Sequence, residues 1–214
     1  MRVGVLCEFS GTVRDAFRAR GHDAVSCDLL PTTNPGPHLQ GDCLAFDWSD
    51  YDLLICHPPC THLAVSGSRW FKDKRVEQEA ALEFVSALMR LPVPRICVEN
   101  PVSVISSRIR KPEQIIQPYE YGHSESKKTC LWLKNLPKLR PTNVLPLPAK
   151  GVWDNQTPSG QNKLGPSPDR WLLRSKTYTG IAAAMAVPLA LSPDRARDGR
   201  GETIAVDGGK GIDH

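Results

Sequence analysis

The chain has 214 residues, of which 40% are hydrophobic and 23% are charged, and its formal net charge at pH 7 is +4. This composition supports a folded core and excludes a wholly disordered protein, and no stretch approaches the ~18 consecutive apolar residues of a membrane helix. Glu8 comes too early for a signal peptide, and the seven cysteines show no CxxC spacing, which argues against a disulfide framework. We therefore expect a soluble, intracellular protein.

Short hydrophobic runs that stop at polar residues or prolines predict six β-strands. They cover residues 2–9, 24–27, 38–41, 51–56, 95–98 and 129–133. Apolar residues at helical spacing predict helices around residues 13–17, over 77–90 and, near the end, over 174–186. Strands that alternate with helices are typical of an α/β fold, in which helices cover both faces of a mostly parallel sheet.

The composition changes along the chain and predicts one domain over residues 1–191. Residues 135–170 are rich in proline and poor in apolar runs, which indicates an irregular insert, and the polar residues 192–214 predict a flexible tail. Residues 1–60 contain four basic and eight acidic side chains, whereas residues 127–176 contain ten basic and two acidic ones. The basic half favours a polyanionic partner, although a solvated lysine-rich loop would have the same composition.

Polar or reactive residues follow the predicted strands at the points where the strands end. They are residues 8–11, Asp28, Asp42, residues 57–60 and residues 99–101. Ligands of parallel α/β sheets bind beyond the carboxyl ends of the strands. We therefore expect these residues to gather along one edge of the sheet.

Cys60 and Glu99 are the candidate reactive groups at this edge. Two prolines hold Cys60 directly after a strand, where a thiol can act as a nucleophile, whereas the other strand-associated cysteines fit the role of small buried hydrophobes. A metal site at His57, Cys60 and His62 would lack the further ligands that structural zinc needs. A thiolate beside a carboxyl group suits addition to C6 of a pyrimidine, with the carboxyl group bound at N3.

At these residues the chain resembles the DNA cytosine-5 methyltransferase family. Pro58-Pro59-Cys60 resembles the family's Pro-Cys nucleophile motif, Glu99-Asn100-Pro101 its ENV motif, and Phe9-Ser10-Gly11 the start of its S-adenosylmethionine loop. The motifs occur in the family order over roughly residues 1–135. The resemblance implies a Rossmann-like fold, S-adenosyl-L-methionine as cofactor, and transfer of its methyl group to C5 of cytosine in DNA.

The resemblance also implies roles for individual residues. The expected catalytic residues are Cys60, Glu99, Asn100 and Lys127; the expected cofactor-binding residues are Glu8, Phe9, Ser10, Gly11, Asp28, Asp42, Cys43, Pro58 and Tyr178; and the expected DNA-binding residues are Arg69, Lys128, Lys134, Lys138 and Arg140. In this scheme a flipped cytosine enters the pocket, Cys60 adds to C6, Glu99 stabilises the proton at N3, and Asn100 shapes the loop. Residues 66–71 resemble a closing loop. No metal is expected.

The sequence departs from the family pattern at four places and in the size of its insert. Thr12-Val13-Arg14 replaces the second half of the cofactor loop, Thr61 replaces a glutamine, and Pro101 replaces a valine. In residues 125–129, which resemble the family's QxRxR segment, Lys127 stands at the first arginine and Thr129 at the second. In the family the second arginine contacts O2 of the target base, so Lys127 or Lys128 is expected to take its place. The insert is too short for a large target-recognition domain. Such compact chains resemble bacteriophage-borne enzymes, and the resemblance therefore implies a monomer in the host cytoplasm that recognises two to four base pairs of double-stranded DNA.

Three alternatives stay open at this point. An amino-group methyltransferase acting on cytosine N4 or adenine N6 would need an Asp/Asn/Ser-Pro-Pro-aromatic motif, whereas the chain has His57-Pro58-Pro59-Cys60. A catalytically inactive nucleic-acid-binding relative would have no reason to keep both Cys60 and Glu99. The same chemistry on RNA or single-stranded DNA is equally compatible with the sequence.

Overall fold

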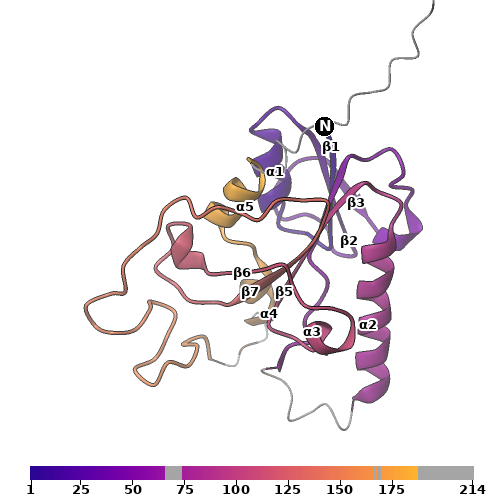
Figure 1. Ribbon diagram of the computed structural model, residues 1–214. Helices are drawn as coiled ribbons and strands as arrows, with labels where there is room; N and C mark the ends of the chain where they lie inside the picture. The colour runs from indigo at the N-terminus through magenta and orange to yellow at the C-terminus, as the bar shows by residue number, and fades with distance from the viewer. Residues whose placement is uncertain (66–73, 166, 168–169, 188–214) are drawn as a thin grey trace, which may run out of the picture.

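The computed structural model describes residues 1–65, 74–165, 167 and 170–187. Within these residues seven strands form one sheet in the order β3-β2-β1-β4-β5-β7-β6 (Figure 1). The strands are β1 (Arg2–Leu6), β2 (Asp23–Asp28), β3 (His38–Gln40), β4 (Leu53–Cys56), β5 (Arg95–Pro101), β6 (Gln114–Ile116) and β7 (Thr129–Lys134). The α-helices are α1 (Thr12–Arg18), α2 (Arg75–Arg90), α3 (Ile105–Arg108), α4 (Arg170–Ser175) and α5 (Thr179–Met185), and two 3₁₀ turns are η1 (Cys43–Ala45) and η3 (Pro118–Glu120).

The sheet is mixed, and this confirms the α/β class while correcting part of its topology. The pairs β2–β3, β1–β2, β1–β4 and β4–β5 are parallel, as the sequence predicted. The pairs β5–β7 and β6–β7 are antiparallel. The strand order therefore matches the classic dinucleotide-binding order, 3-2-1-4-5-6, except that the antiparallel strand β7 lies between β5 and β6. The fold is consistent with a Rossmann-like arrangement.

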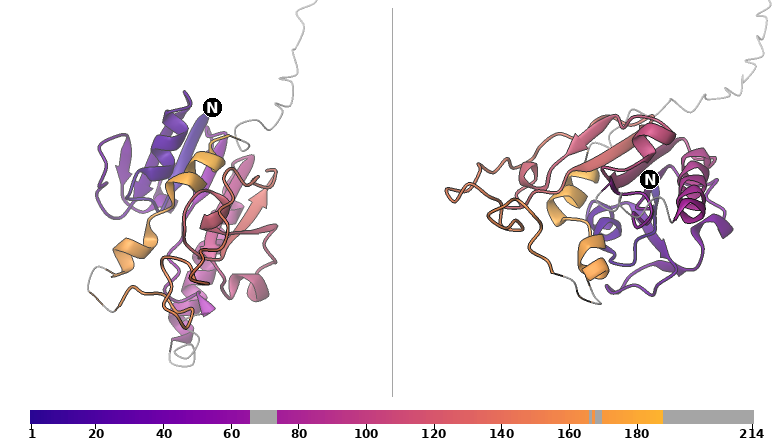
Figure 2. Two further views of the ribbon diagram at one scale, coloured as in Figure 1. Left: turned by 90° about the vertical axis from the view of Figure 1, so that its left-hand side faces the viewer. Right: turned by 90° about the horizontal axis from the view of Figure 1, so that it is seen from below.

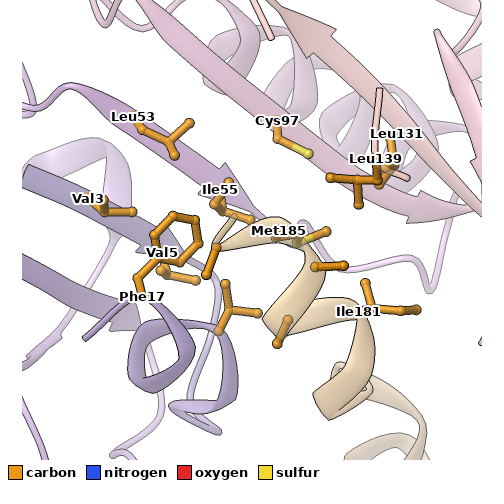
Figure 3. Packing of buried hydrophobic residues seen from close by; sticks show 14 of the residues in the cluster. Val3, Val5, Phe17, Leu53, Ile55, Cys97, Leu131, Leu139, Ile181 and Met185 are labelled. Atoms are coloured by element: carbon orange, nitrogen blue, oxygen red, sulfur yellow. The ribbon is translucent and has the colours of Figure 1, made fainter. Parts of the chain in front are cut away.

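Side chains that alternate along the central strands build two separate cores, one on each face of the sheet. Val5 and Ile55 pack with Phe17 of α1 and with Ile181 and Met185 of α5 (Figure 3). Leu54, Cys56 and Val98, which point the other way, belong to the core that contains Leu82, Val85 and Leu88 of α2 and Ile105 of α3. Helices thus cover both faces, as expected (Figure 2). The predicted last helix is instead two short helices, α4 and α5, separated at residues 176–178.

The predicted irregular insert has no helix or strand in its described residues up to 165, but several contacts fix its place. It runs back from the end of β7 and projects beside residues 119–126 (Figure 1). The Trp153 ring stacks on Tyr119 with 4.4 Å between centroids and 4° between planes. Asn155 accepts a hydrogen bond from the Ser126 amide (3.1 Å) and donates one to its carbonyl (2.9 Å). The insert is therefore irregular but anchored.

Gly4 in the middle of β1 gives the first test of this packing. A Cβ atom there would lie 2.6 Å from Leu54 Cδ2 and 2.9 Å from the Trp48 ring, in the core under α2. Gly4→Ala should therefore lower the free energy of unfolding by about 1–3 kcal/mol, as overpacking does, measured by urea denaturation. Gly165→Ala is the matched control, because nothing lies within 4 Å of its Cβ. Equal stability of the two variants would contradict the described packing.

Candidate active site

The carboxyl ends of β1, β4 and β5 lie side by side and bring the predicted reactive residues together. Leu6 of β1 is in register with Cys56 of β4, and Cys56 with Val98 of β5. Because β7 is antiparallel, its first residue, Thr129, pairs with Pro101 at the same edge. Residues 57–60, residues 99–101 and Lys127 therefore meet at one edge of the sheet, which confirms the predicted convergence.

Cys60 is the one exposed cysteine of the seven. It lies in a loop that Asn100 holds in place. The Asn100 side chain is buried and donates a hydrogen bond from Nδ2 to the Pro58 carbonyl (2.8 Å). The Cys60 carbonyl accepts hydrogen bonds from the amides of Leu63 (3.1 Å) and Ala64 (2.9 Å). Asn100 thus holds the loop in which the exposed Cys60 lies.

The electrostatic surroundings of Cys60 join it to Glu99. Desolvation by the surrounding protein is the largest influence and raises the pKa of the thiol above its ordinary 9.0, and the Glu99 carboxylate raises it further. The charges of Lys127 and Arg174 act in the opposite direction without reversing the shift. Cys60 and Glu99 are therefore close enough to influence each other, and the resting site holds a protonated thiol.

Glu99 forms a hydrogen bond with His57 across the two central strands. The His57 Nδ1 to Glu99 Oε2 distance is 2.9 Å, and the side chains are 8% and 15% exposed. Burial pushes the pKa of Glu99 upward, but the hydrogen bond and charge of His57, with Lys127, outweigh it and hold the pKa below its ordinary 4.5. Glu99 is therefore an ionised acceptor at neutral pH.

Lys127 lies beside Glu99 and contacts the segment that contains Arg174 and Tyr178. Its Nζ donates to the Arg174 carbonyl at 3.0 Å and lies 6.0 Å from the centroid of the Tyr178 ring. The space beside Glu99, between Lys127 and Tyr178, has a volume of only about 10 Å³. This is the room of at most one water molecule.

A larger cavity, of about 410 Å³, lies away from these residues, over Ile96, Val98 and Trp132 on the α2 face. Its charged members already have partners: Arg110 pairs with Glu113, and Lys134 donates to the carbonyls of Leu91 (3.3 Å) and Val93 (2.9 Å). None of the predicted catalytic residues lines it. The larger cavity volume therefore does not identify the candidate active site.

The predicted cofactor loop follows β1, and part of it is used by the protein itself. The Glu8 carboxylate is buried and accepts hydrogen bonds from the amides of Val13 (2.6 Å) and Arg14 (3.2 Å), so it caps α1. The predicted cofactor role of Glu8 is corrected accordingly, because both carboxylate oxygens are engaged inside the protein. Gly11 has a φ of +72°, and a Cβ there would lie 2.4 Å from the Arg14 guanidinium, so the turn requires glycine.

The other predicted cofactor residues divide into buried and accessible groups. Phe9, Ser10, Cys43 and Pro58 are buried. Cys43 packs beneath the surface, with its sulfur 3.9 Å from that of Cys7. Asp28, at the end of β2, and Asp42, beside β3, remain at least partly exposed, and each accepts one backbone hydrogen bond at 2.9 Å, from Leu30 and Leu44. Tyr178 is half-buried, and its hydroxyl donates to Glu125.

The predicted DNA-binding residues do not lie on one surface. Lys128, Lys138 and Arg140 are exposed. Lys134 pairs with Ile96 at the opposite edge of the sheet, and its ammonium group is bound to backbone carbonyls, so its predicted contact with DNA at the site is corrected. Arg69 and the predicted closing loop lie outside the described residues, as does the tail over 192–214.

Two contributors to the site were not predicted as such. His57 entered the sequence analysis only as a metal-ligand candidate, although it pairs with the carboxylate 42 positions later. Arg174, exposed on α4, faces Cys60 from a helix predicted only as the last of the chain. In the described part of the chain, no group of three or more His, Cys, Asp or Glu side chains could hold a metal ion, and no helix there is long and apolar enough to cross a membrane.

Comparison with known proteins adds no identification: the chain matches no family model, and a search of curated proteins finds no match. The site must therefore be interpreted from its own geometry.

The raised pKa of Cys60 predicts how this thiol reacts. Alkylation by iodoacetamide requires the thiolate, so the labelling rate of Cys60 should keep rising with pH beyond 9, followed by peptide mass spectrometry. Cys56 and Cys97 are fully buried and should label only on unfolding. Cys60→Ser is the control and should remove the labelled peptide. A rate that is fast and constant between pH 6 and 8 would instead show a preformed thiolate.

Proposed function

We propose that this chain is a DNA cytosine-5 methyltransferase that transfers the methyl group of S-adenosyl-L-methionine through a covalent adduct between Cys60 and C6 of a flipped cytosine. The observation that carries the proposal is the placement of an exposed cysteine and an ionised, partly buried glutamate at neighbouring strand ends, close enough for the carboxylate to raise the pKa of the thiol. That pair is what addition of a thiolate to a pyrimidine requires.

The sheet gives further support. Its order, with one reversed strand between β5 and β6, is consistent with the Rossmann-like fold that the resemblance implies. Asp28 offers a partly exposed carboxylate at the end of β2, where ribose hydroxyls are bound in such folds. S-adenosyl-L-methionine would supply an electrophilic methyl group there.

The residues of the site suit the steps of this reaction. Cys60, which is exposed, must first lose its proton to water, and the charges of Lys127 and Arg174 favour this loss. The thiolate then attacks C6, while Glu99 accepts the hydrogen bond of the exocyclic amine and stabilises the proton at N3. Asn100 holds the Pro58 carbonyl and so keeps Cys60 at the strand end. After methyl transfer, loss of the C5 proton to water allows Cys60 to be eliminated.

The exposed cations beside the site favour a nucleic acid substrate. Lys128 and Arg174 are exposed at this edge, and Lys138 and Arg140 are exposed where the insert begins. Such groups neutralise phosphates and position the strand. The geometry does not support the amino-group methyltransferase alternative. The first residue of its motif would have to accept the hydrogens of the target amine, whereas His57, at that position, forms a hydrogen bond with Glu99 through its Nδ1.

The catalytic pair can be tested by product analysis. Wild-type protein, duplex DNA and S-adenosyl-L-methionine should give 5-methylcytosine, detected by nucleoside mass spectrometry. Cys60→Ser and Glu99→Gln should each lower the rate at least 10²-fold, because the nucleophile or the carboxylate is removed. Lys111→Gln, on the loop before β6, is the surface control. Parallel reactions with single-stranded DNA and RNA identify the substrate, and N4-methylcytosine or N6-methyladenine as product would contradict the proposal.

The cofactor site has its own test. Asp28→Asn keeps an oxygen for the Leu30 amide but removes the charge, and it should weaken binding of S-adenosyl-L-methionine about tenfold in calorimetry, because hydrogen bonds to charged groups are the stronger ones. Asp50→Asn is the control, because Asp50 pairs with Arg2 (3.5 Å) at the start of β1, on the opposite edge. Equal affinity of the two variants would contradict this placement of the cofactor.

A further inference from the structure

Only one of the two ring nitrogens of His57 forms a hydrogen bond among the described residues. Its amide donates to the Leu6 carbonyl (2.9 Å), which fixes the residue between β1 and β5, and its Nδ1 bonds to Glu99. Its Nε2 is buried and has no hydrogen-bond partner among the described residues. Buried polar nitrogens without partners are rare in proteins, and each one calls for an explanation.

The state of Glu99 determines which atom carries the proton between the two side chains. Since His57 and Lys127 hold the pKa of Glu99 below its ordinary value, the carboxylate is the acceptor and Nδ1–H is the donor. The charged groups around the pair are Lys127, from the segment before β7, and, beside Cys60, Arg174 of α4. Glu8, at the end of β1, is engaged with α1. Glu99 by itself therefore has no proton to give at neutral pH.

The proposed reaction needs such a proton. When a thiolate adds to C6 of cytosine, the C5=C6 electron pair moves toward C4 and the C4=N3 pair moves onto N3, which must be protonated. We propose that His57 is a positioning residue that acts through Glu99 and holds, as imidazolium, the proton that Glu99 relays to N3 when Cys60 adds. This inference rests on the proposed function and assigns its proton source.

The step balances in atoms and charge. The Cys60 Sγ–C6 bond forms as the C5=C6 π bond breaks, His57 Nδ1 gives its proton to the Glu99 carboxylate, and Glu99 passes a proton on to N3. His57 becomes neutral with its remaining proton on Nε2, and Glu99 is again a carboxylate. On elimination the Sγ–C6 bond breaks and the N3 proton returns by the same route. The unpartnered Nε2 is then the nitrogen that keeps its proton throughout, and the hydrogen bond to Glu99 is the path of transfer.

A substitution that keeps the hydrogen bond but not the proton separates this role from a structural one. The Asn side chain of His57→Asn places an N–H donor near the position of Nδ1 but cannot become charged in this pH range. Under single-turnover conditions it should bind DNA and S-adenosyl-L-methionine as the wild type does and react about 10²-fold more slowly, the lower range for a lost general acid. Its rate optimum should move to lower pH, where Glu99 itself becomes protonated. His22→Asn, at the opposite edge of the sheet, is the matched control.

Two measurements make the test independent of any one variant. Imidazole should restore methylation by His57→Ala in proportion to its charged form. Nitrogen NMR of the wild type at the pH of its maximal rate should show both ring nitrogens of His57 protonated. The inference is overturned if His57→Asn keeps the wild-type rate and pH profile, or if the wild-type ring carries one proton at that pH. A wild type that methylates no cytosine in DNA or RNA would instead overturn the proposed function, and the proton source with it.

Discussion

The site depends on a buried carboxylate that the protein must keep charged. A carboxylate at the end of a central strand loses much of its hydration, and this cost is met only if neighbouring groups stabilise its charge. Here His57 does so from the next strand, by the 2.9 Å hydrogen bond, and Lys127 does so from the segment that leads into β7. The interaction therefore joins β4, β5 and β7 at the same place where it prepares a hydrogen-bond acceptor. The same negative charge adds to the desolvation that raises the pKa of the Cys60 thiol, so Cys60 is a thiol at rest.

The two edges of the sheet have different roles. At the carboxyl edge the loops carry exposed or half-buried reactive groups, and the insert is anchored beside them through Trp153 and Asn155. At the amino edge the charged groups serve the fold: Arg2 pairs with Asp50, and Lys134 binds the carbonyls that follow α2. Among the described residues, the cations that act on the site come from two segments: Lys127, before β7, and Arg174, on α4. The space between Lys127 and Tyr178 is narrow, with a volume of about 10 Å³.

Much of the fold could be predicted from the sequence, because buried strands are short apolar runs with sharp ends. β4, for example, is an apolar run stopped by two prolines, and α2 presents its apolar residues at helical spacing. The direction of β7 could not be predicted, because a strand buried on both faces has the same pattern whether it runs parallel or antiparallel. β6 was missed because it has only three residues.

The site was predicted in outline and not in its contacts. Cys60 and Glu99 could be found because strand ends meet at one edge. The His57–Glu99 pair could not, because it joins residues far apart in sequence whose side chains had to be on the same face of neighbouring strands. The use of Glu8 as a cap for α1 was likewise hidden, since an acidic residue before a helix can face either the helix or a ligand.

The most direct measurement is covalent trapping on duplex DNA that carries 5-fluorocytosine, in the presence of S-adenosyl-L-methionine. Fluorine at C5 prevents the final elimination, so an adduct that survives denaturation should form, and peptide mass spectrometry should locate it at Cys60. Absence of an adduct from protein that binds both DNA and cofactor, or its location at another residue, would contradict the account.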